Sequence, residues 1–140
     1  MNDIMHKVVE YLKNFIGRPY IWGGDGTGAK SGGFDCSGLI LEGLCAFGAY
    51  SGGDTTADGL RLWAGRNGWK SVKRGEVEEG DLVFFGSSKA THIAISIGDG
   101  LILEAGGGSS SCTKFENSTG YVRIRPLSRR KDFLVAYRFK

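Results

Sequence analysis

Three residues whose types suit nucleophilic catalysis lie in two short fragments of the chain. The first fragment, residues 33–39 (GFDCSGL), carries Cys36, and the second, residues 91–105 (THIAISIGDGLILEA), carries His92 and Glu104. A thiol that is activated by an imidazole, with a third polar group to orient the ring, is the arrangement that forms covalent acyl intermediates. The two fragments therefore predict a hydrolase that uses a cysteine nucleophile.

Cys36 is expected in the first turn of a helix. Asp35 is a good N-cap residue, and the unpaired N–H groups and the dipole of the helix would then favour a thiolate at Cys36. The charge of Asp35 opposes that thiolate, so a cationic partner is needed. His92 is the candidate, because the other histidine, His6, lies on an amphipathic opening helix and is expected at the surface.

His92 is expected at the start of a strand whose side chains alternate between two faces. The isoleucines of this strand share one face, which should pack inward, and His92 shares the other face with small residues. From this second face His92 would meet the Cys36 helix if that helix lies across the sheet.

Glu104 follows His92 by twelve positions, across a turn at residues 98–100. A two-residue loop would pair Glu104 with an isoleucine and bury its carboxylate on the apolar face. A three-residue loop with Gly100 in the left-handed conformation pairs Glu104 with Ala94 and places it on the His92 face. The second register avoids an unpaired buried charge, so we predict it.

The other elements follow from hydrophobic periodicity and turn residues. Helices are expected near residues 2–16, 35–47 and 55–64, and strands near residues 81–85, 92–97, 101–105, 121–125 and 134–139. The third helix would begin at Asp54 or Thr55 as its cap, with Leu60 and Trp63 turned inward. Helices followed by a run of strands indicate an α+β fold with a mostly antiparallel sheet.

Length and composition fit a single domain over residues 1–140, because 140 residues with 41% hydrophobic content can bury one ordinary core. The net charge is +3, and residues 121–140 hold seven Lys/Arg against one acid. The alternating Arg123 and Arg125 favour a solvated strand face over a polyanion site, so no nucleic acid is expected. No apolar run approaches about 18 residues and the first sixteen residues do not resemble a secretory signal, so no membrane span and no signal peptide are predicted.

Three cysteines, Cys36, Cys45 and Cys112, do not make an even disulfide framework, and zinc-ligand spacings are missing. Cys45 is expected as a small core residue of the Cys36 helix. Residues 24–31 resemble a phosphate-binding loop, but two glycines follow it where a helix would be needed. No metal, nucleotide or other cofactor is therefore predicted.

The chain resembles the NlpC/P60 family of papain-like cysteine peptidases, which cut peptidoglycan stem peptides. The motifs that carry the resemblance are residues 20–24 (YIWGG), 33–39 (GFDCSGL), 80–85 (GDLVFF) and the hairpin 92–105. The resemblance implies a half-papain-like fold, in which the Cys36 helix packs on an antiparallel sheet of five or six strands.

Carried over position by position, the resemblance makes Cys36 the nucleophile, His92 the general base and acid, and Glu104 the third polar residue. Family members more often place His, Asn or Gln at the third position, and a glutamate there should favour a charged imidazole. Candidates for the lining of the cleft are Trp22, Trp63 and Ser109, with core packing as the alternative for the tryptophans.

Three further residues match positions beside the thiol in this family. Tyr20 matches a tyrosine whose hydroxyl could polarise the substrate carbonyl. Asp35 and Ser37 match residues that, in some members, hold the free amine of an N-terminal stem-peptide alanine. Helix capping is the equally weighted alternative for Asp35 and Ser37.

The function implied is a monomeric cysteine endopeptidase that hydrolyses the bond between D-glutamate and a diamino acid through a thioester. The chain would be made in the cytoplasm and reach the cell wall or periplasm as a phage lysin released by a holin, in a virion, or by injection. The alternatives are a catalytically silent peptidoglycan-binding or phage structural component, and an acyltransferase or amidase on the same fold.

Overall fold

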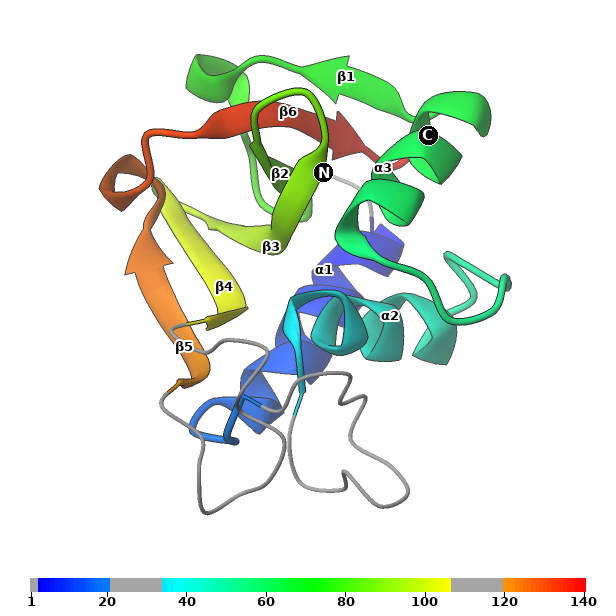
Figure 1. The fold of residues 1–140 in the computed structure, drawn as a ribbon. Coiled ribbons are helices and arrows are strands. Elements are labelled where there is room, and N and C mark those ends of the chain that lie inside the picture. Colours follow the sequence, from blue (N-terminus) through cyan, green and yellow to red (C-terminus); the bar gives the residue numbers. More distant parts are fainter. Residues whose placement is uncertain (1–2, 21–33, 107–119) are drawn as a thin grey trace.

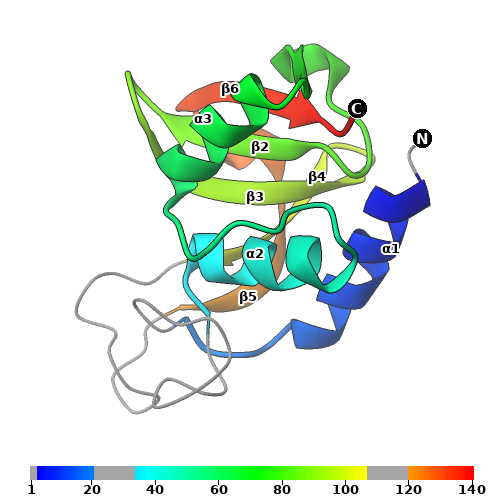
Figure 2. The ribbon, with the colours of Figure 1, turned by 90° about the vertical axis from the view of Figure 1, so that its right-hand side faces the viewer.

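The computed structural model describes residues 3–20, 34–106 and 120–140. Its helices are α1 (Asp3–Leu12), α2 (Cys36–Ala46) and α3 (Ala57–Arg66), and its strands are β1 (Lys70–Val72), β2 (Leu82–Gly86), β3 (Ala90–Gly98), β4 (Leu101–Gly106), β5 (Tyr121–Pro126) and β6 (Phe133–Arg138). All three helices lie on one side of an open, curved sheet (Figures 1 and 2). The sheet has six strands in the order β1-β6-β2-β3-β4-β5, and its neighbours pair antiparallel. The expected α+β class is confirmed.

Two layers of apolar side chains cover the two faces of the sheet. The larger core joins the helices to the face that carries Phe84, Ile93 and Ile95, all of which are fully buried. A smaller cluster on the other face includes Phe85 and Ala94. The isoleucine face of β3 therefore packs inward, as its alternation predicts.

The helices begin where side-chain caps satisfy their first N–H groups. Asp35 caps α2, accepting a hydrogen bond at its Oδ1 from the backbone N of Gly38 at 2.7 Å. The expected cap of α3 is wrong, because Thr56 takes that position and its side chain accepts from the backbone N of Gly59 at 3.0 Å. The cap residue must have extended backbone, and Thr56 has it, with φ −95° and ψ 174°.

The β3–β4 hairpin has the predicted register but a different loop. Ile95 pairs with Leu103, and in this register Ala94 lies opposite Glu104. The turn itself contains two residues, Asp99 and Gly100, with φ of 56° and 74°. The pairing shifts by one residue between Ser96 and Gly98, and this bulge restores the register that a three-residue loop would have produced.

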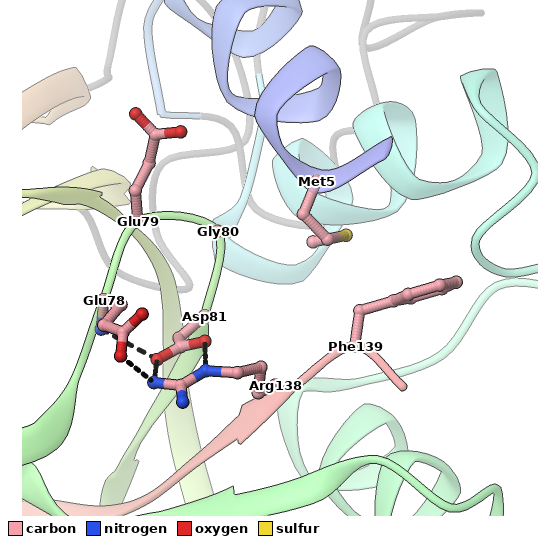
Figure 3. Close-up of a pocket in the computed structure, with 7 residues that line it drawn as sticks. All are labelled: Met5, Glu78, Glu79, Gly80, Asp81, Arg138 and Phe139. Atoms are coloured by element: carbon pink, nitrogen blue, oxygen red, sulfur yellow. Dashed lines mark hydrogen bonds and ion pairs between the residues drawn. The ribbon is translucent and has the colours of Figure 1, made fainter. Parts of the chain in front are cut away.

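An ion pair fixes β2 to β6 at the end of the sheet nearest α1 (Figure 3). Asp81 is 1% exposed, and its two carboxylate oxygens accept from Nε and NH2 of Arg138 at 2.9 and 2.8 Å. One of these oxygens also accepts from the backbone N of Glu78 at 2.8 Å.

The sequence analysis does not predict β1, a three-residue strand that pairs with β6 at the edge of the sheet.

The prediction for Cys45 is wrong. This residue and Ala46 are exposed at the end of α2, although Gly43 and Leu44 directly before them are buried. Cys36 and Cys45 are both free thiols. Among the residues that the structure describes, none of the helices has the length and apolar character that crossing a membrane requires.

Candidate active site

Cys36 is the first residue of α2, directly after its capping aspartate, and its side chain is partly buried against the main core. The first N–H groups of a helix have no partner within the helix, and the helix dipole is positive at this end. The thiol therefore lies where negative charge is favoured, and the backbone N–H of Cys36 is suited to stabilising an oxyanion.

His92 lies on β3 and presents its ring to both other members of the predicted group. Its Nε2 is 2.7 Å from Oε1 of Glu104, and its side chain is 11% exposed. Because Nε2 is engaged, Nδ1 is the ring nitrogen left for Cys36. Burial favours the neutral ring, but hydrogen bonds and charge interactions with Cys36 and Glu104 outweigh it and raise the pKa of His92 above its ordinary value.

Glu104 lies on β4 between two cationic partners. Its carboxylate is 3% exposed; Oε1 faces His92, and Oε2 accepts from Nε of Arg123 at 3.0 Å. Burial alone would raise the pKa of Glu104, but His92 and Arg123 reverse this effect and lower that pKa to about 2. The carboxylate is therefore ionised at neutral pH and favours the imidazolium form of His92.

Gly106 leaves room for this ion pair. A Cβ atom at Gly106 would lie 2.8 Å from Oε2 of Glu104 and 3.0 Å from NH2 of Arg123. Side chains at this position would therefore displace one of the two charged groups.

The route by which the thiol reaches the imidazole differs from the expected one. The helix α2 packs on the isoleucine face of β3, whereas His92 lies on the opposite face, next to Phe85. The ring centroids of Phe85 and His92 are 5.6 Å apart. The body of α2 therefore does not cover the His92 face, and the contact is made by Cys36 at the N-terminal tip of the helix.

A pocket of about 430 Å³ opens beside the thiol. Tyr20, Asp35, Cys36 and Ser37 line one part of it, and residues 54–57 with 90–91 line the rest. The predicted neighbours of the thiol, Tyr20, Asp35 and Ser37, are thus brought together around the same space.

Asp35 and Ser37 make the contacts of a helix cap. In addition to the bond from the Gly38 backbone, Oδ1 of Asp35 accepts from Oγ of Ser37 at 3.4 Å. The capping interpretation therefore describes their observed contacts, and binding of a substrate amine stays a prediction.

The predicted cleft-lining residues do not line the pocket beside the thiol or fall outside the described residues. Trp63 packs edge-on between Tyr50 and Trp69, at centroid distances of 4.9 and 5.8 Å. Trp63 therefore packs in the core, which was the alternative to lining the cleft. Trp22 and Ser109, like Cys112, fall outside the described residues.

The sequence does not predict the arginines beside Glu104. Its alternation indicates a solvated face for Arg123, but this residue lies opposite Glu104 in the β4–β5 register and donates from its Nε to the carboxylate. Arg130 lies over the Phe85 ring at 4.6 Å and pairs with Asp132 at 2.8 Å. A predicted pairing of the strand carrying Glu104 with the strand carrying Arg123 would have supplied the signal.

Two further observations concern metal-binding groups and a second pocket. Within residues 3–20, 34–106 and 120–140, His, Cys, Asp and Glu side chains form no group of three that could bind a metal ion. A second pocket of about 430 Å³ is lined by Glu78, Glu79, Asp81, Arg138 and apolar neighbours from α1 and the C-terminus (Figure 3). Cys36 does not line this second pocket, whereas it lines the first.

Comparison with known proteins gives matches along most of the chain. Residues 17–127 match the model of the NlpC/P60 family. The peptidoglycan endopeptidase RipB of Mycobacterium tuberculosis is 32% identical over 115 residues, which cover 76% of this chain and 45% of that protein. The probable peptidoglycan endopeptidase LytE of Bacillus subtilis is 34% identical over 115 residues, which cover 80% of this chain and 30% of that protein. This chain thus spans less than half the length of either relative.

Solved structures share the fold. The structure of the peptidoglycan hydrolase RipB from M. tuberculosis has a TM-score of 0.71 at 28% identity, covering 97% of this chain and 64% of that one. RipD from the same organism, described as a non-catalytic domain protein adapted to peptidoglycan binding, also has a TM-score of 0.71, at 22% identity and full coverage of both chains. The same architecture therefore occurs in a hydrolase and in a protein described as non-catalytic.

Proposed function

The chain belongs to the NlpC/P60 family, and from this membership and the geometry around Cys36 we propose that it is a cysteine endopeptidase that hydrolyses peptidoglycan stem peptides. The observation that carries the proposal is the chain of contacts from Cys36 through His92 to the buried carboxylate of Glu104. A protein that only binds peptidoglycan has no need of a thiol beside an imidazole whose pKa is raised. The names of the matched relatives supply the substrate class.

The first half of the reaction would be acylation of the thiol. Cys36 donates its proton to Nδ1 of His92, and the resulting thiolate attacks the carbonyl carbon of the scissile amide. The tetrahedral oxyanion is held by the backbone N–H of Cys36, with the hydroxyl of Tyr20 as a second donor. His92 then protonates the leaving amine, and the C–N bond breaks to leave a thioester on Cys36.

The second half would release the acyl group. His92, now neutral, removes a proton from water, and the hydroxide attacks the thioester carbonyl. Collapse of this intermediate expels the thiolate and yields a carboxylate product. Throughout, Glu104 accepts the hydrogen bond from Nε2 of His92, orients the ring and stabilises its charged form.

The scissile bond we propose is the one between D-glutamate and the diamino acid of the stem peptide. Asp35 and Ser37 would hold the amine at the start of that peptide, on the pocket side of the thiol. Because this substrate lies outside the cytoplasm, we propose that the domain acts at the cell wall or in the periplasm. Delivery by a holin, in a virion or by injection would each bring it there.

The test is mass spectrometry of defined muropeptides after incubation with purified protein. The wild type should release fragments cut after D-glutamate, and Cys36→Ala should abolish the cleavage. Cys45→Ala is the matched control, because it removes an exposed thiol from the same helix and should leave the cleavage intact. Identical spectra for the wild type and Cys36→Ala with every muropeptide would refute the peptidase, and muropeptide binding without cleavage would then identify a silent binding domain.

A further inference from the structure

A small pocket beside Glu104 is lined by four arginines. Arg123, Arg125, Arg129 and Arg130 surround a space of about 160 Å³, with Glu104 as the acidic residue in its wall. It forms at the edge of the sheet where β4 and β5 run side by side (Figure 1). Glu104 pairs with Arg123 and Asp132 pairs with Arg130, so four guanidinium groups stand against two carboxylates and the space keeps an excess of positive charge.

The contacts of the arginines leave much of this charge unneutralised. Arg123 uses its Nε for Glu104, and Arg130 uses its Nε and NH2 for Asp132. Within residues 3–20, 34–106 and 120–140, Arg125 and Arg129 make no ion pair. Glu104 accounts for Arg123, and Asp132 with the Phe85 ring accounts for Arg130, so Arg125 and Arg129 are the two arginines that need a different explanation.

Hydrogen bonds with Arg74 and Gly100 hold the segment that carries Arg129 and Arg130 in place. NH2 of Arg74 donates to the backbone carbonyls of Leu127 and Arg130, at 3.3 and 2.9 Å. The backbone N of Leu127 donates to the carbonyl of Gly100 at 2.8 Å. These bonds fix the turn against the β3–β4 hairpin, so the wall of the pocket is formed before any ligand arrives.

From this arrangement we propose that the arginine pocket binds an oxyanion, a carboxylate or phosphate group; the assignment of this group to a cell-wall component rests on the function proposed above. Guanidinium groups present several N–H donors in one plane and pair with such groups through two hydrogen bonds at once. An excess of positive charge in a concave site also concentrates anions there. The pocket is separate from the space beside the thiol, and binding there does not require that the protein hydrolyse anything.

The position of the pocket connects it to the triad. Glu104 contacts His92 with one oxygen and Arg123 with the other. The hydrogen bond and charge of Asp132 raise the pKa of Arg130 most. The charges of Glu104 and Cys36 raise this pKa further. An oxyanion among these arginines would compete with Glu104 for Arg123.

The test is an NMR titration of the side-chain Nε–H signals of arginine in the full chain, with inorganic phosphate and with acetate, against chloride at equal ionic strength. We expect saturable shifts of the pocket arginines with phosphate, acetate or both. Phosphate preference would indicate a phosphorylated wall polymer, and acetate preference a peptide carboxylate. Shifts that follow ionic strength alone would overturn the proposal.

Two variants make the test specific. Arg125→Gln combined with Arg129→Gln should weaken binding about tenfold or more, because bonds to charged groups are lost. Arg66→Gln with Lys70→Gln is the matched control, since it removes two exposed cations from α3 and from the opposite sheet edge. Equal weakening in both double variants would show diffuse attraction and overturn the site. Glu104→Gln should tighten oxyanion binding, about threefold or more, by removing the competing carboxylate. Unchanged affinity in this variant would also overturn the proposed site.

Discussion

Replacing the buried carboxylate of Glu104 by an amide should cost stability at neutral pH and little in acid. Glu104→Gln keeps the shape of the side chain and removes its charge. The variant resembles the protonated form of the wild type, so the two proteins should become equally stable once the carboxylate is protonated. The difference between them then measures how much the ionised group contributes to the fold.

The magnitude follows from the pKa of Glu104, which falls from 4.5 to about 2 in the folded chain. Each tenfold change in proton affinity corresponds to 1.36 kcal/mol, so ionised Glu104 contributes about 3 kcal/mol, as an order of magnitude. Because the folded pKa lies below the unfolded one, this stability is present above pH 4.5 and is lost as the pH falls from 4.5 towards 2.

The assay is urea denaturation of the wild type and Glu104→Gln between pH 7 and pH 2.5. The difference in free energy of unfolding should be about 3 kcal/mol at pH 7 and should shrink through the acid range. Glu76→Gln is the control, because Glu76 is exposed and its replacement should change stability by less than about 0.5 kcal/mol at any pH.

A difference between wild type and Glu104→Gln that stays constant from pH 7 to pH 2.5 would refute this reasoning. It would mean that shape or packing is lost rather than charge. A variant as stable as the wild type at pH 7 would show that His92 and Arg123 do not repay the burial of the carboxylate.

Other changes test the contacts that support the site and the fold. Arg138→Met should leave the buried Asp81 carboxylate without its ion pair and lower the free energy of unfolding by about 2–3 kcal/mol, measured in urea at pH 7. Thr56→Ala removes the cap that accepts from Gly59 and should cost about 1 kcal/mol, seen as a lower melting temperature, whereas Thr56→Ser should restore the wild-type value. Gly106→Ala should displace the Glu104 ion pair and lower the pKa of the His92 imidazole, followed by NMR; an unchanged imidazole pKa would show that the pair tolerates the methyl group.

The order of the three helices and of strands β2 to β6 could be predicted from the sequence because each of them carries a local signal, whereas the three-residue β1 could not. The helix cap at Asp35 and the alternation along β3 depend on residues only a few positions apart. The hairpin register was also accessible, since only one pairing keeps Glu104 away from the isoleucines. These features are fixed by contacts within a fragment, and such contacts are visible in a single chain.

Contacts between residues on different strands far apart in the sequence could not be predicted in this way. Arg123 meets Glu104 across nineteen positions, and nothing in the local pattern distinguishes it from a solvated arginine. Exposure was misjudged for a related reason. Cys45 looks apolar by type, but the face of α2 on which it lies is decided by packing against α1 and β3.

The position of β5 at the edge of the sheet has a consequence for self-association. An outermost strand offers unpaired backbone groups to which another chain could add a further strand. The first half of β5 is capped by the chain itself, since Gly17 and Arg18 exchange backbone hydrogen bonds with Val122. The second half ends in Pro126, which has no N–H to donate, and carries the cationic side chain of Arg125, which repels a like-charged neighbour. Neutralising Arg125 should therefore expose the protein to strand addition and aggregation, so variants of this edge are best handled at low concentration.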